Sequence, residues 1–230
     1  MPDRTSQFGG RVPQAGPDFP SYTAAESAAD RIVHLVGLAA AAVAIGWLLG
    51  RIVPGATIKQ LVAVSIYCVG LVSMLAASAV YNLVSPSRLK AVLRRLDHSM
   101  IFVMIAGSYT PFTMGVLRPQ LGIPLCAVVW GLAAIGIALK LLRPCRGELA
   151  SLGLYLGMGW LVLGILHPLL TVLPGAVLLL LLVGGLIYSL GAFVHARARI
   201  PFHNALWHAM VVTAAALHFA AVADISFGPG

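Results

Sequence analysis

Polar side chains that could carry out chemistry stand at the ends of long apolar stretches in this chain. Ser78 and Asn82 close the second stretch, Asp97 precedes the third, and Asn204 and His208 open the last. Residues four apart share a helix face, so Ser78 pairs with Asn82 and Asn204 with His208. If successive stretches alternate in direction, all five lie at one end of a helix bundle. Glu26, Asp30 and His34 approach the same depth from the first stretch.

Imidazole, carboxylate and water enclosed in a polar pocket suit a zinc ion with an activated water. This pattern makes His208 a candidate metal ligand, and it makes Asp97 and Ser78 candidate catalytic residues. A simpler interpretation is open for each of them. His208 would bond a backbone carbonyl, Asp97 would pair with a nearby arginine or with His34, and Ser78 would bond back to the carbonyl of Met74.

One further histidine immediately precedes the last stretch and another lies within it. His203 is a second candidate metal ligand, but on an ideal helix it points about 140° away from His208, so it converges only if the helix starts after it. Asn204 is a good N-cap and would place the helix start there. His218 lies about 15 Å beyond His208 along a helix and is expected to be structural.

The elements that position these residues are membrane helices. The chain has 230 residues, of which 60% are hydrophobic and 10% charged, whereas a soluble domain has roughly 25% charged residues. Continuous apolar runs favour helices over a β-barrel. We predict an all-α, polytopic bundle of seven transmembrane helices over residues 32–53, 59–84, 98–117, 123–142, 149–167, 176–195 and 204–223.

Residues 1–21 are predicted to be a disordered cytoplasmic tail and residues 22–230 one membrane domain. Of the 15 Lys and Arg residues, 12 fall in alternate segments and 3 in the others. Positive charge favours the cytoplasm. The N-terminus is therefore predicted to be cytoplasmic and the C-terminus extracytoplasmic.

Two other classes of protein are disfavoured. The three cysteines are too few and scattered for a disulfide framework or a CxxC metal site. The net charge of +8 lies in short loops rather than on one soluble face, so no nucleic-acid partner is expected. Membrane lipids are the expected partners.

The same polar segments resemble the hemolysin III family, the bacterial branch of the adiponectin and progestin receptor group. The resemblance covers residues 22–220. It is carried by Tyr22-Thr-Ala-Ala-Glu26, Ile32-Val-His34-Leu-Val-Gly37, Ala77-Ser-Ala-Val-Tyr81, Leu96-Asp-His-Ser99, Ile105-Ala-Gly-Ser-Tyr-Thr-Pro-Phe112, Leu156-Gly-Met-Gly-Trp160, Arg199-Ile-Pro-Phe202, Leu206-Trp-His208 and Leu217-His-Phe219.

The resemblance implies seven helices, a cytoplasmic N-terminus and a zinc ion near the cytoplasmic face. Ser78, Asp97 and His208 match its pattern, but Asn82 and Asn204 stand where two histidine ligands are expected. A neutral amide is a poor ligand for zinc. We therefore expect a zinc site that is weakened or absent.

Two functions follow, and the sequence leaves both open. In the first, the chain is an inner-membrane protein whose hydrolase-like pocket opens to the cytoplasm and inner leaflet, where an activated water attacks a lipid amide or ester. In the second, it is a non-enzymatic sensor or a pore-forming, cytolytic protein that has lost its metal. Zinc content would separate them.

Overall fold

A computed structural model of the chain describes residues 22–142, 148–197 and 200–227, and these residues are entirely helical apart from short loops. The all-α prediction is confirmed, while the predicted tail, residues 1–21, lies outside the described residues. The elements are α1 (Ala24–Ile52), α2 (Ile58–Leu83), α3 (Arg88–Gly115), α4 (Pro119–Leu142), α5 (Glu148–Trp160), the 3-10 helix η1 (Leu161–Ile165), α6 (Leu166–Val172), α7 (Gly175–His195) and α8 (His203–Phe227).

Six helical segments within the described part of the chain are long and apolar enough to cross a membrane. They are α1, α2, α4, residues 150–172, α7 and α8. Large apolar side chains on these helices face outward, among them Ile32, Leu35 and Val36 on α1. Hydrocarbon is the environment that accepts such a surface. The predicted third span forms the second half of α3, whose first half carries the basic residues Arg88, Lys90, Arg94 and Arg95.

The first two helices begin with capping boxes. The Thr23 hydroxyl accepts a hydrogen bond from the Glu26 backbone N–H, and the Glu26 carboxylate bonds back to the Thr23 backbone. Thr57 and Gln60 form the same arrangement before α2. These reciprocal bonds satisfy N–H groups that a helix end leaves unpaired. As a result α1 begins at Ala24, well before the apolar run that starts at Ile32.

The predicted fifth span is interrupted in the structure. The chain passes from α5 into η1 and then into α6 before Leu173. The Tyr109 hydroxyl, from α3, reaches the interruption: it lies 2.9 Å from the Met158 carbonyl and 3.0 Å from that of Gly159, and it accepts the Val162 N–H at 3.0 Å. One α3 side chain thus satisfies backbone groups that the break leaves unpaired.

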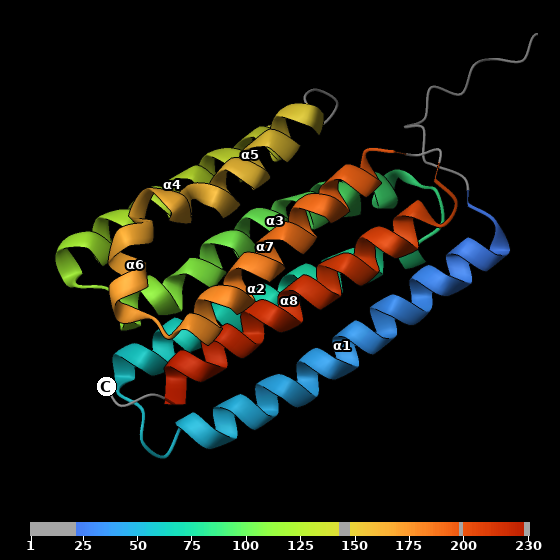
Figure 1. Ribbon diagram of the computed structural model, residues 1–230. Helices are drawn as coiled ribbons and strands as arrows, with labels where there is room; N and C mark the ends of the chain where they lie inside the picture. The colour runs from blue at the N-terminus through green and yellow to red at the C-terminus, as the bar shows by residue number, and fades with distance from the viewer. Residues whose placement is uncertain (1–21, 143–147, 198–199, 228–230) are drawn as a thin grey trace, which may run out of the picture.

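Helix α1 lies at one edge of the bundle, and α4 and α5 lie at the opposite edge (Figure 1). The helix α8 packs against both α1 and α7. Gly37 lets α1 approach α8 closely, because a Cβ atom at this position would lie 2.8 Å from Cγ2 of Val212. Gly37 lies less than one helical turn after His34, and Val212 lies just over one turn after His208. The close approach of α1 and α8 at this contact therefore holds His34 and His208 near each other.

Candidate functional site

A buried cluster joins the first and last helices. Asp30 and His34 lie one turn apart on α1, and His208 faces them from α8. Their exposed fractions are only 6%, 4% and 7%. His208 Nδ1 lies 2.5 Å from Oδ1 of Asp30, and the His34 and His208 ring centroids are 4.4 Å apart. The close helix approach at Gly37 makes this contact possible.

The three residues have the arrangement of a metal site. One ligand atom from each lies within 4.8 Å of those from the other two. His34 Nε2 lies 3.4 Å from Oδ2 of Asp30, but the contact lacks hydrogen-bond geometry, and within the described chain this buried nitrogen has no hydrogen-bond partner. A carboxylate and two imidazoles form a recognised set of zinc ligands. These residues therefore fit a divalent cation.

The structure brings the predicted catalytic residues to this cluster. The Ser78 hydroxyl lies 3.3 Å from His208 Nε2. Asp97, with an exposed fraction of 9%, faces the same hydroxyl. Because Nδ1–H of His208 donates to Asp30, the lone pair of the neutral ring lies on Nε2, where it can bind a metal ion or accept the Ser78 O–H. Ser78 lies between Asp97 and His208, and its single proton can be donated to one of the two at a time.

The two asparagines bond to their neighbours. Asn204 Nδ2 donates to Oδ1 of Asn82 at 3.3 Å, and Asn82 Nδ2 donates to the Ser78 carbonyl at 2.9 Å. The helix α8 begins at His203, so the predicted N-cap role of Asn204 is wrong: its amide turns toward α2 instead. The asparagines tie α2 to α8 beside the Asp30–His34–His208 cluster.

His203, the other predicted metal ligand, lies apart from that cluster. Its Nδ1 faces the Ile200 carbonyl at 3.2 Å, and its ring packs on Tyr22 with centroids 5.6 Å apart. Burial, with smaller effects from Tyr81 and Asp30, raises the pKa of Tyr22 to about 12, so this phenol stays neutral. His203 belongs to the first turn of α8 and, as helix geometry requires, points away from His208.

Asp30 and His34 are candidate site residues for which the sequence indicated only the depth in the bundle. Their signal is the spacing: an Asp and a His four residues apart share one face of an otherwise apolar helix. Nothing in that spacing tells which partner the face meets. The packing of α1 on α8 decides it.

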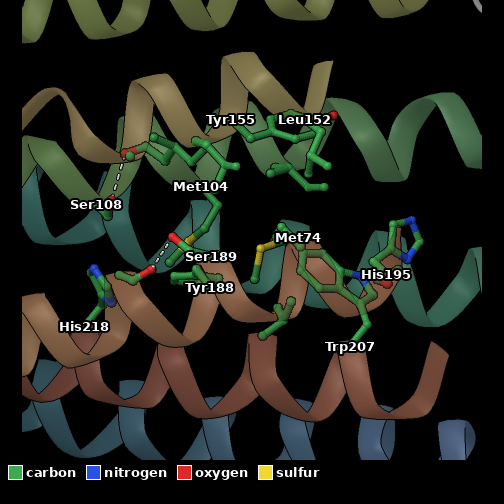
Figure 2. A pocket seen from close by; sticks show the side chains of 18 of the residues that line it. Met74, Met104, Ser108, Leu152, Tyr155, Tyr188, Ser189, His195, Trp207 and His218 are labelled. Carbon is green, nitrogen blue, oxygen red and sulfur yellow. Dashed lines mark hydrogen bonds between the residues drawn. The ribbon is translucent and has the colours of Figure 1, made fainter. Parts of the chain in front are cut away.

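A cavity of about 720 Å³ extends from the cluster into the bundle. Ser78, Asp97 and His208 line one part of it, and the remainder is mainly apolar, with Met74 and Met104 among its walls. Figure 2 shows these methionines facing the space between α3, α7 and α8. Ligand cavities in proteins typically have volumes of about 300–1,000 Å³. A single acyl chain is a chemically suitable occupant.

Known proteins resemble the chain over most of its length. Residues 25–219 match the family model described as Haemolysin-III related. The Hemolysin-3 homolog of Bacillus subtilis (strain 168) is 35% identical over 198 residues, covering 86% of this chain and 93% of that protein. Hemolysin-3 of Bacillus cereus is 34% identical over 194 residues, covering 84% and 89%. The Homo sapiens monocyte to macrophage differentiation factor is 35% identical over 170 residues, covering 68% and 67%. No solved structure matches significantly.

Proposed function

The chain belongs to the haemolysin-III related family of multi-pass membrane proteins, and from that premise we propose that it is a zinc-dependent hydrolase of a lipid amide or ester. The observation that carries the proposal is the buried Asp30, His34 and His208 cluster beside Ser78 and Asp97. The topology proposed with it has seven spans, with α3 as the third, a cytoplasmic N-terminus and a location in the inner membrane.

The ligand set differs from the one that the family resemblance implies. Asn82 and Asn204 occupy two expected histidine positions and are engaged with each other. Helix α1 supplies Asp30 and His34 in their place. Two imidazoles and a carboxylate leave a fourth position open for water or substrate, which is the usual composition of a catalytic zinc site.

The chain's own residues have distinct roles in this proposal. Asp30, His34 and His208 would hold the ion, which would supply a Lewis acid and a water of lowered pKa. The Asp97 carboxylate takes the proton from the attacking water, and the Ser78 hydroxyl positions His208. The apolar cavity binds the acyl chain and excludes bulk water from the reacting bond.

A second candidate is a non-enzymatic sensor or pore-forming protein. The bond between Asn82 and Asn204 favours it, because two amides occupy positions where the family pattern expects ligands. In that case the Asp30–His208 bond only ties α1 to α8. The two candidates differ in whether the protein releases fatty acid from a lipid in a reaction that requires Asp97.

Fatty-acid release from ester and amide lipids in nanodiscs tests the proposal. The wild type should hydrolyse one of these lipid classes, a zinc chelator should stop the reaction, and Asp97→Asn should lower the rate at least about 100-fold. His203→Gln is the matched control, because His203 lies outside the cluster, and it should keep most of the rate. Zinc-loaded wild type without any release would favour the non-enzymatic function.

A further inference from the structure

A second polar group lines the cavity, far from the Asp30–His34–His208 cluster. It consists of Tyr188, from the second half of α7, and His218, from the second half of α8. The centroids of the two rings lie 5.5 Å apart. Figure 2 shows both side chains at the cavity, with His218 at the left end of the view. The proposed chemistry does not use this Tyr188–His218 pair.

The Tyr188 hydroxyl is buried without a partner. Within the described chain its oxygen makes no hydrogen bond, and the same holds for the hydroxyl of Tyr67 on α2. The two phenols lie close enough to interact electrostatically. Leaving a buried polar group unpaired is costly, and folded proteins contain few such groups. This part of the cavity therefore requires a hydrogen-bonding group that the described side chains do not supply.

The His218 ring offers the complementary group. Its Nδ1 faces the Ala214 carbonyl at 3.0 Å, so in a neutral ring the lone pair lies on Nε2. Gly184 on α7 makes room for the ring, because a Cβ atom there would lie 2.5 Å from Nδ1 of His218. Tyr188 thus supplies an O–H donor and His218 an acceptor. Together they suit a hydroxyl group, which both accepts and donates a hydrogen bond.

The depth of the pair determines where along a ligand that hydroxyl would lie. His218 follows His208 by three helical turns on α8, which is about 15 Å along the helix axis. A carbon–carbon bond of about 1.5 Å advances an extended hydrocarbon chain by about 1.3 Å. The pair therefore lies about 12 carbons from a carbonyl placed at the Asp30–His34–His208 cluster. Between the two depths the cavity has apolar walls that include Met74 and Met104.

An ordered water is the simplest occupant of the pair in the empty cavity. Because Tyr188 and His218 line the same space as the apolar walls, an acyl chain that fills the cavity displaces that water. A methylene group cannot replace the hydrogen bonds of the water, whereas a hydroxyl on the chain can. The pair therefore discriminates between acyl chains even if water occupies it in their absence.

We propose that Tyr188 and His218 form a subsite for a hydroxyl group in the middle of the acyl chain, so that the preferred lipid carries a hydroxylated acyl group. The Tyr188 O–H donates to the hydroxyl oxygen of the lipid, and the lipid O–H donates to Nε2 of His218. This inference rests on the proposed function in placing the acyl chain in the cavity with its carbonyl at the cluster, and it adds the class of substrate.

Positional isomers of one ester test the subsite without relying on catalysis. Methyl 12-hydroxyoctadecanoate and methyl 7-hydroxyoctadecanoate have the same composition. Competition against radiolabelled methyl octadecanoate, on zinc-stripped protein in neutral detergent, gives a Kd for each isomer. The wild type should bind the 12-hydroxy isomer at least about tenfold more tightly, because only its hydroxyl reaches the pair. Tyr188→Phe and His218→Leu should each remove most of that preference.

Tyr155→Phe is the matched control, because Tyr155 also lines the cavity but its hydroxyl is bonded to the His98 carbonyl at 2.8 Å. This variant should keep the preference within about twofold. Equal affinity of the wild type for the two isomers would overturn the proposal and leave water as the only occupant of the pair. A preference that survives both Tyr188→Phe and His218→Leu would overturn it too. Absence of hydrolysis with the preference intact would refute the proposed hydrolase and leave the subsite standing.

Discussion

Tyr109→Phe should destabilise the bundle by about 3 kcal/mol. The hydroxyl has one proton, which the Met158 and Gly159 carbonyls share, and it accepts the Val162 N–H. Its removal therefore eliminates two hydrogen bonds at a net cost of about 1 kcal/mol each. The Val162 N–H, at the start of η1, is left without an acceptor, which adds about 1 kcal/mol or more.

The assay is reversible unfolding in mixed micelles, with Tyr155→Phe as the matched control. The Tyr155 hydroxyl makes one bond, to the His98 carbonyl at 2.8 Å, so its loss should cost about 1 kcal/mol. The difference of about 2 kcal/mol between the variants is the quantity of interest. If Tyr109→Phe cost no more than Tyr155→Phe, the idea that one phenol stabilises the broken helix would be refuted.

Three further predictions concern the site and the topology. Asn82→His combined with Asn204→His should tighten zinc binding at least about tenfold, because imidazole replaces amide beside the cluster; unchanged affinity in a zinc titration would contradict this. Gly37→Leu should lower zinc content, since its side chain would push α1 off α8 at Val212, whereas Gly46→Leu on the same helix meets open space and should be neutral. A reporter active only in the cytoplasm should work when fused between α2 and α3 and be silent at the C-terminus; activity at the C-terminus would rule out the proposed orientation.

Helix positions were largely predictable because apolar runs determine what can lie in hydrocarbon. The apolar run alone placed the start of the first helix too late, at residue 32, although Thr23 and Glu26 have the spacing of a capping box. The break after Trp160 was not foreseen either. It depends on Tyr109, which lies far away in sequence and supplies the bonds that make an irregular segment tolerable.

The site was predictable to a lesser extent. Helical spacing and alternating direction brought Ser78, Asp97 and His208 to one depth, and the structure places them together. Spacing could not show that Asp30 and His34 face His208, because rotation of α1 about its axis is set by packing contacts such as Gly37 against Val212. For the same reason, His203 remained a candidate ligand on sequence grounds alone.

Zinc content per purified chain tests the central claim most directly. The wild type should carry close to one zinc per chain, and Asp30→Asn should lose most of it, because one of three ligands becomes a neutral amide. His203→Gln should keep the wild-type content. Wild-type protein that binds no zinc even when the ion is supplied, or an Asp30→Asn variant that retains a full zinc, would contradict a metal centre built from Asp30, His34 and His208.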